Sequence, residues 1–169
     1  NVYYILNDKD FSKITQELGD IMIAKNLSVT TAESCTGGWV SQEITAIPGS
    51  SKLFGFGLVT YSNKAKNQVL NVAKDTLKRR GAVSIEVVEE MVSGALDLSG
   101  ADIGIAISGV AGPSGGSKRT PVGTVCMAWK ILGQEAISIR ERFSGNREEV
   151  RIKTVNRALL GCLDLAKNL

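Results

Sequence analysis

The chain has 169 residues, 43% of them hydrophobic and 22% charged, which is the balance of a globular protein with a sizeable core. Its net charge of +3 is too mild to indicate a nucleic-acid partner, and no apolar run approaches the roughly 18 residues that a transmembrane helix needs. Because the chain contains no histidine, a Ser-His-Asp triad, a Cys-His dyad and a histidine-ligated zinc site are excluded within it.

Hydrophobic periodicity predicts helices that alternate with short strands early in the chain and a hairpin late in it. Residues 1–9 open with an apolar patch that fits either an edge strand or an arm onto a partner. The strands, which are short and apolar, are predicted at 27–31, 54–61, 101–108, 122–132 and 136–143. The helices, which carry an apolar face or a capping residue, are predicted at 11–25, 39–46, 74–80 and 84–98, with two more beginning at 63 and 146.

This order of elements predicts an α/β fold, a three-layer α/β/α sandwich with a mixed sheet, in a single domain over residues 1–169. In sheets of this kind, ligands gather at the carboxyl ends of the strands. We therefore expect the turns that follow Thr31, Tyr61 and Ser108 to converge on one site. The loop that follows Ser108 is the longest in the chain, and a long loop inside a compact domain is usually functional or disordered.

The turn at residues 33–38 joins a predicted strand to a predicted helix and carries a candidate nucleophile, Ser34. A polar turn before a helix aims backbone N–H groups into one small volume, where they can hold an anion. Two interpretations stay open: a glycine-containing turn in which Ser or Thr caps the helix, and a nucleophile above an anion hole. Cys35 is a rival nucleophile, although a small buried thiol is the more common fate of such a residue.

Without histidine, a serine nucleophile needs a lysine, a carboxylate or a metal-bound water as its base. Lys64 and Lys66 lie about 200° apart around a predicted helix, so at most one of them faces inward. Lys66 shares its face with apolar residues, and partial burial there would lower its pKa towards that of a useful base. The alternative is a lysine that snorkels along an apolar groove. Glu33, next to Ser34 but pointing the other way along an extended segment, is expected to be an orienting carboxylate.

Two arginines at the start of the last helix indicate an anionic ligand. Arg147 lies in the first helical turn, where the helix dipole disfavours a cation, and Arg151 follows one turn later on the same face. Both could reach one phosphate; the alternative is a surface ion pair with Glu148 or Glu149. The loop at 112–118 offers further N–H groups, but it is not a P-loop because no Gly-Lys-Ser/Thr motif opens a helix.

Several short blocks stand in a fixed order along the chain, at residues 31–38, 59–66, 81–84, 107–113 and 121–124. Together they resemble the CinA C-terminal family, whose active members are bacterial nicotinamide-nucleotide amidases. The resemblance covers nearly the whole chain and implies a CinA C-terminal-like amidase domain. The implied reaction is hydrolysis of the carboxamide of nicotinamide mononucleotide (NMN), which yields nicotinate mononucleotide and ammonia.

The resemblance also implies roles for particular residues, with no metal and no cofactor. The nucleophile matches Ser34 and the base matches Lys66. The positions implied to bind substrate are Thr36, Gly37, Tyr61, Ser108, Gly109 and Arg147. The expected partner is the nucleotide substrate, without nucleic acid or membrane, in a homo-oligomer that we expect to be a dimer. Cys35, Cys126 and Cys162 are scattered and odd in number, which favours a reducing compartment, here the cytoplasm.

The chain departs from the family pattern at a few positions, and an alternative function follows from them. Ile85 stands in a block that commonly carries other residues, and the loop after Ser108 has Ser114, Lys118 and Arg119 where a less basic sequence is expected. Some family members are inactive paralogues. The alternative to an amidase is therefore a catalytically silent nucleotide-binding module that regulates a partner. A nucleic-acid role is disfavoured by the mild charge and the 5% aromatic content.

Overall fold

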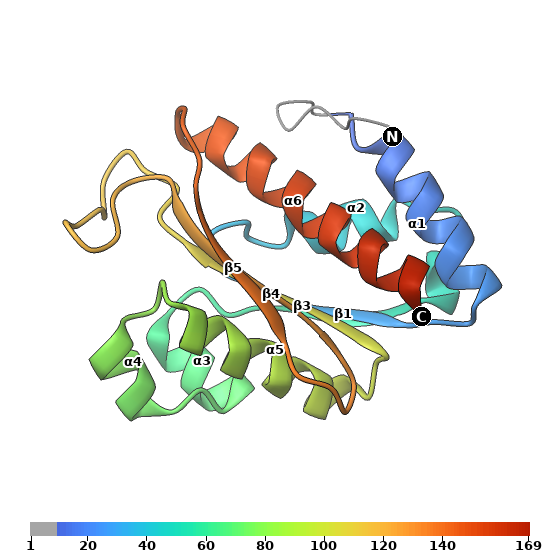
Figure 1. The fold of residues 1–169 in the computed structure, drawn as a ribbon, viewed down its shortest axis with the longest axis horizontal. Helices are drawn as coiled ribbons and strands as arrows, with labels where there is room; N and C mark the ends of the chain where they lie inside the picture. The colour runs from blue at the N-terminus through green and yellow to red at the C-terminus, as the bar shows by residue number, and fades with distance from the viewer. Residues whose placement is uncertain (1–9) are drawn as a thin grey trace.

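A mixed β-sheet forms the middle of the computed structural model, which describes residues 10–169 (Figure 1). In these residues the sheet has five strands: β1 Val29–Glu33, β2 Phe54–Val59, β3 Ile103–Gly109, β4 Thr124–Ile131 and β5 Ile137–Arg142. Their order is β2-β1-β3-β4-β5, in which β1 pairs in parallel with β2 and β3. β4 runs antiparallel to both β3 and β5, so the predicted late hairpin closes one edge of the sheet.

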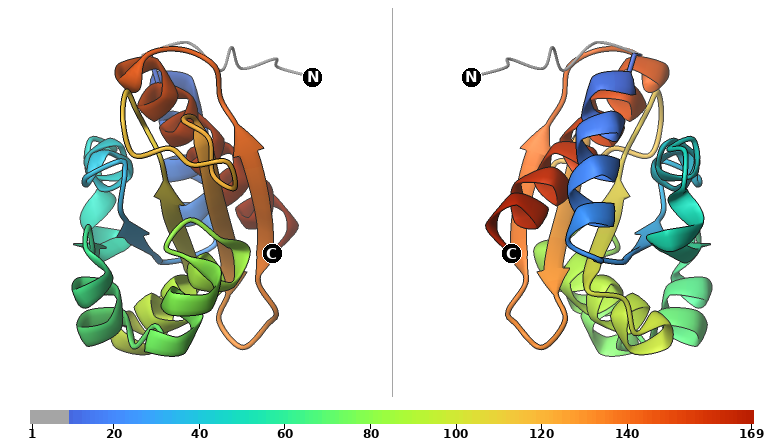
Figure 2. Two further views of the ribbon diagram at one scale, coloured as in Figure 1. Left: turned by 90° about the vertical axis from the view of Figure 1, so that its left-hand side faces the viewer. Right: turned by 90° about the vertical axis from the view of Figure 1, so that its right-hand side faces the viewer.

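Helices cover both faces of this sheet, which confirms the predicted three-layer α/β/α domain. One face carries α1 Ser12–Ala24, α2 Trp39–Thr45 and α6 Arg147–Asn168 (Figure 1). The other face carries α3 Asn63–Leu70, α4 Lys74–Arg80 and α5 Ile85–Ser99. After a quarter turn, α1 and α6 still lie towards the top and α3, α4 and α5 towards the bottom (Figure 2). No helix within residues 10–169 is long and apolar enough to cross a membrane.

The central strand β3 shows how the sequence builds these layers. Alternate residues of a strand point to opposite faces, so Ile103, Ile105 and Ile107 join the larger core under α1 and α6. The opposite face of β3 carries small residues, and a Cβ on Gly104 would lie 2.8 Å from Val92 Cγ2 of α5. The small residues therefore let α5 pack directly onto the middle of the sheet.

Most of the predicted elements are confirmed within one or two residues, and their caps with them. Ser62 and Ser84 cap α3 and α5, and Asn146 forms a capping box with Glu149 at the start of α6. The first strand was expected at 27–31 but runs to Glu33, because parallel pairing with β3 continues as far as Glu33 and Ile107. Likewise β2 ends at Val59, two residues before the predicted end. The expected arm or edge strand at 1–9 lies outside the described residues.

Gly94 sets the distance between α5 and α3, and its replacement tests this packing. In an exposed helix an alanine is about 1 kcal/mol more favourable than a glycine. A Cβ on Gly94, however, would overlap the backbone carbonyl of Leu70, which cannot rotate away. Gly94→Ala should therefore lower the free energy of unfolding by about 1–3 kcal/mol, the usual cost of overpacking, in urea denaturation.

Gly55→Ala is the control for this measurement, because a Cβ there meets nothing within 4 Å. Its unfolding midpoint should stay close to that of the wild type. A Gly94→Ala protein that is as stable as Gly55→Ala would contradict the close contact between the two helices.

Candidate active site

The carboxyl ends of the three parallel strands converge on one cavity, as the sequence predicts. Ser34 directly follows β1, Tyr61 lies two residues beyond β2, and Ser108 lies near the end of β3. The cavity has a volume of about 230 Å³, and its lining includes Ser34, Tyr61, Lys66, Ser108, Gly109 and Arg147. Residues that are far apart in the sequence thus meet because parallel strands end at the same edge of a sheet.

Lys66 and Ser34 form the central contact of this cavity. The Nζ atom of Lys66 lies 3.1 Å from Ser34 Oγ and donates to the carbonyl oxygens of Thr60 at 2.9 Å and Tyr61 at 3.4 Å. Only 1% of the Lys66 surface is exposed. Burial disfavours the charged amine and lowers the pKa of Lys66 to about 8. The snorkelling alternative is therefore wrong, because the amine ends inside the protein.

The helix periodicity also separates the two lysines as predicted. Lys66 lies on the buried face of α3, together with Leu70. Lys64 is on the exposed side of the same helix. Of these two lysines, only Lys66 lies within hydrogen-bonding distance of Ser34 Oγ.

Glu33 is buried directly before Ser34 in the chain, where it holds the start of α2. Its carboxylate accepts hydrogen bonds from Thr36 Oγ1 at 2.7 Å, from Val40 N at 2.9 Å and from Ser41 through both N and Oγ, at 3.0 and 2.7 Å. The N–H groups at the start of a helix favour a negative charge, so α2 is pinned to the end of β1. These bonds give Glu33 the orienting role that the sequence indicates.

Cys35 does not compete with Ser34 as a nucleophile. Its side chain is buried, and this desolvation raises the pKa of the thiol to about 12. The thiolate is the reactive form of cysteine, so a thiol with this pKa is inert near neutral pH. Gly109 packs against the Cys35 sulfur. A Cβ at Gly109 would lie 2.8 Å from Val125 Cγ2 and 3.1 Å from Cys35 Sγ, so a side chain there does not fit without a shift.

The two arginines of α6 face different cavities, although they lie one turn apart. Arg147 lines the Ser34 cavity and donates to Gly112 O at 2.7 Å and to Tyr61 Oη at 3.2 Å. Arg151 instead lines a neighbouring cavity of about 510 Å³, together with Thr36 and Gly37. The interpretation in which both arginines reach one phosphate does not fit this geometry. Thr36 and Gly37 line this neighbouring cavity and not that of Ser34, and their contribution to substrate binding stays a prediction.

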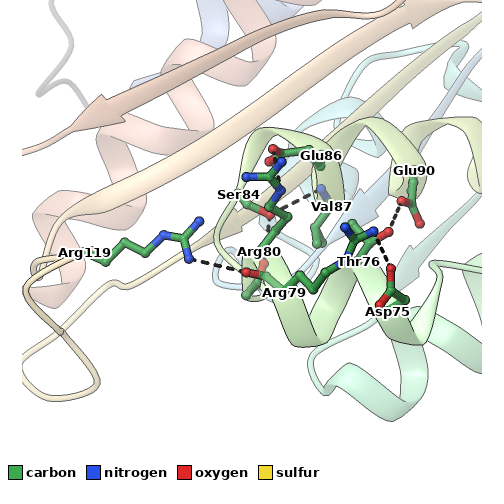
Figure 3. Close-up of polar contacts among 10 residues, drawn as sticks. Asp75, Thr76, Arg79, Arg80, Ser84, Glu86, Val87, Glu90 and Arg119 are labelled. Carbon is green, nitrogen blue, oxygen red and sulfur yellow. Dashed lines mark hydrogen bonds and ion pairs between the residues drawn. The ribbon is translucent and has the colours of Figure 1, made fainter.

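The departures from the family pattern lie mostly outside the cavity. Ser114 lines it, but Ile85, Lys118 and Arg119 are not among its lining residues. Figure 3 shows Arg119 reaching the end of α4, where Nη1 donates to Arg79 O at 3.4 Å. The basic part of the loop is therefore fastened to α4 at some remove from Ser34.

Burial of the Lys66 amine makes a prediction for the pH dependence of stability. The pKa of Lys66 is about 8 in the folded state against 10.5 for a free lysine, so the unfolded chain binds more protons between these values. The contribution of Lys66 to the stability of the wild type should therefore rise from pH 8 to pH 10.5. Relative to Lys66→Met, the gain should be on the order of 3 kcal/mol, measured as unfolding free energies across this range.

Lys64→Met provides the control for the loss of one lysine from the same helix. If the unfolding free energies of the wild type and Lys66→Met run parallel from pH 8 to pH 10.5, the amine of Lys66 is not desolvated in the folded protein.

Known proteins share this fold and much of this sequence. The sequence model of the protein family named CinA C-terminal domain matches residues 11–165 of this chain. The nicotinamide-nucleotide amidohydrolase PncC of Escherichia coli (strain K12) is 48% identical over 154 residues, which cover 91% of this chain and 93% of that protein. The Pseudomonas putida protein of the same name is 51% identical over 152 residues, which cover 90% of this chain and 94% of that protein. The crystal structure of a CinA superfamily protein from Klebsiella pneumoniae 700603 superposes with a TM-score of 0.91 at 40% identity, covering 95% of this chain and all of that one (100%). The chain belongs to the CinA C-terminal domain family.

Proposed function

We propose that the protein hydrolyses the carboxamide of NMN to nicotinate mononucleotide and ammonia, with Ser34 as nucleophile and Lys66 as base. The observation that carries the proposal is the buried amine of Lys66, 3.1 Å from Ser34 Oγ. It is supported by the similarity to proteins named nicotinamide-nucleotide amidohydrolase over about nine tenths of the chain.

The reaction begins with neutral Lys66, whose lone pair accepts the hydroxyl proton of Ser34. Ser34 Oγ bonds to the amide carbon and forms a tetrahedral intermediate. The protonated Lys66 then gives its proton to the amide nitrogen, the C–N bond breaks and ammonia leaves. Water, deprotonated by the same lysine, attacks the ester and releases the acid. Because the pKa of Lys66 is about 8, part of the enzyme holds the neutral base at physiological pH.

Backbone N–H groups of the turn after Ser34 are the proposed oxyanion hole. The N–H of Ser34 is already used, since it donates to Ile107 O at 3.1 Å, and the N–H of Gly37 donates to Ser34 O at 3.0 Å. Within residues 10–169, the N–H groups of Thr36 and Gly38 donate to no backbone carbonyl. Of these two, the N–H of Thr36 lies closer in sequence to Ser34. A donor of this kind typically contributes about 3 kcal/mol to the transition state.

Arg147 is the proposed phosphate ligand. Its guanidinium group lies at the cavity, and its present partners, Gly112 O and Tyr61 Oη, are neutral. A guanidinium group binds a phosphate through paired, charge-assisted hydrogen bonds, which are stronger than bonds to neutral acceptors.

The expected homodimer stays a prediction that sedimentation equilibrium would test.

Release of ammonia from NMN tests the dyad. Ser34→Ala should abolish it, and Lys66→Ala should reduce the turnover at least ~10²-fold, the usual contribution of a general base. The wild-type rate should rise with pH as Lys66 loses its proton and should level off above about pH 8. Lys64→Ala, on the exposed side of α3, should keep the wild-type rate. Near wild-type turnover by Lys66→Ala would refute the dyad, whereas no ammonia release by the wild type would leave a silent binding module as the alternative.

A comparison of two substrates tests Arg147. Arg147→Ala should raise KM for NMN by far more than it changes the reaction with nicotinamide riboside, which has no phosphate. The loss of a charged hydrogen-bonding partner typically costs about 1.5–3 kcal/mol, or a factor of roughly 10 to 150 in affinity. Equal effects on both substrates would show that Arg147 only supports the loop at Gly112.

A further inference from the structure

Arg151 binds the turn at residues 33–38, which we call the nucleophile turn, from the side opposite to the substrate cavity. From the second turn of α6, its Nε donates to Cys35 O at 3.1 Å and its Nη2 donates to Thr36 O at 3.0 Å. The guanidinium group lies over the ring of Trp39, 5.2 Å from its centroid. Trp39 is in turn braced by an edge-to-face contact with Phe11, at 6.0 Å between centroids. Arg151 is thus fixed in orientation and bonds to two consecutive carbonyl groups.

The two carbonyl groups determine where the neighbouring N–H groups point. A peptide unit is planar and trans, so its N–H points opposite to its C=O. With Cys35 O held towards Arg151, the N–H of Thr36 must point away from it. With Thr36 O held in the same way, the N–H of Gly37 also points away, and it does reach Ser34 O at 3.0 Å. The N–H of Thr36 is left without an acceptor in the described part of the chain.

We propose that Arg151 is a positioning residue that orients the oxyanion hole of the amidase. This inference rests on the proposed function. Arg151 acts through the peptide units 35–36 and 36–37 and does not touch the substrate, since it lines the neighbouring cavity rather than that of Ser34. The fork of an arginine suits this task, because it can bond two acceptors at once in a fixed plane.

The transition state should depend on Arg151 more than the bound substrate does. Without the guanidinium group, the peptide unit 35–36 can rotate and bring Cys35 O towards the cavity. A carbonyl oxygen in that place repels the negative charge that develops on the substrate oxygen. The neutral carboxamide of the bound substrate carries no such charge, so its affinity changes little.

Arg151→Gln tests this role through separate measurement of kcat and KM. We expect kcat for ammonia release from NMN to fall about 10²-fold, as for the loss of one oxyanion donor, with KM near the wild-type value. Arg151→Lys keeps the charge and can bond one of the two carbonyls. Its kcat should therefore lie between those of Arg151→Gln and the wild type. The pH at which the rate is half-maximal should not move, because Lys66 keeps its surroundings.

Arg157→Gln is a matched control from the same helix. Arg157 lies over Trp129 at 5.1 Å from the ring centroid, a stacking like that of Arg151, and it is not a lining residue of the Ser34 cavity. Its removal should lower thermal stability to a similar extent and leave kcat unchanged. If Arg151→Gln raises KM and keeps kcat, or loses no more activity than Arg157→Gln, the positioning role is wrong.

A fluorophosphonate probe gives a readout that does not depend on the substrate. Ser34 Oγ displaces fluoride from the phosphorus, the hydroxyl proton passes to Lys66, and the phosphoryl oxygen occupies the oxyanion position. Arg151→Gln should slow this labelling by a factor similar to its loss in kcat, and Arg157→Gln should not. Slow labelling of Arg151→Gln with no ammonia release from NMN by the wild type would refute the proposed substrate and uphold the positioning role. Equal labelling rates in Arg151→Gln and the wild type would overturn the positioning role for any substrate.

Discussion

The site depends on one energetically unfavourable placement, the amine of Lys66 inside the protein. Desolvation of the amine lowers its pKa to about 8, and this same penalty makes the neutral, basic form accessible near neutral pH. The packing around Lys66 has to offset this free-energy cost of desolvation. The α3 helix is held against α5, where Gly94 permits contact with the backbone at Leu70, and the carbonyls of Thr60 and Tyr61 accept from the amine. In the proposed mechanism, the protein thereby gives up stability and gains a usable base.

The nucleophile turn is held by charges of opposite sign on its two sides. Glu33 accepts from N–H and hydroxyl donors at the start of α2, and Arg151 donates to the carbonyls of Cys35 and Thr36. The Glu33 carboxylate binds hydrogen-bond donors and the Arg151 guanidinium group binds acceptors, so the two side chains do not compete for the same groups. Within residues 10–169, the N–H of Thr36 has no backbone acceptor, and in the proposed mechanism it faces the negative charge that develops on the substrate.

The parallel half of the sheet and its antiparallel half contribute differently to this arrangement. β1, β2 and β3 end at the same edge and deliver Ser34, Tyr61 and Ser108 to the cavity. β4 and β5 add no catalytic residue in the proposed mechanism. They return the chain across the sheet so that α6 can begin near the site. In its first two turns, Arg147 then lines the Ser34 cavity and Arg151 lines the neighbouring one.

Local patterns in the sequence were enough for the fold class, for the caps at Ser62, Ser84 and Asn146, and for the inward face of Lys66. Each of these depends on residues within a few positions of one another, through a helical period or a single hydrogen bond. The end of β1 at Glu33 was missed because a strand ends where its neighbours stop pairing, which no local period records. The separation of Arg147 from Arg151 was decided only in three dimensions. The two residues lie one turn apart and line different cavities, because Arg151 is bonded to Cys35 O, 116 residues away in the chain. Only the folded packing creates a contact of that kind.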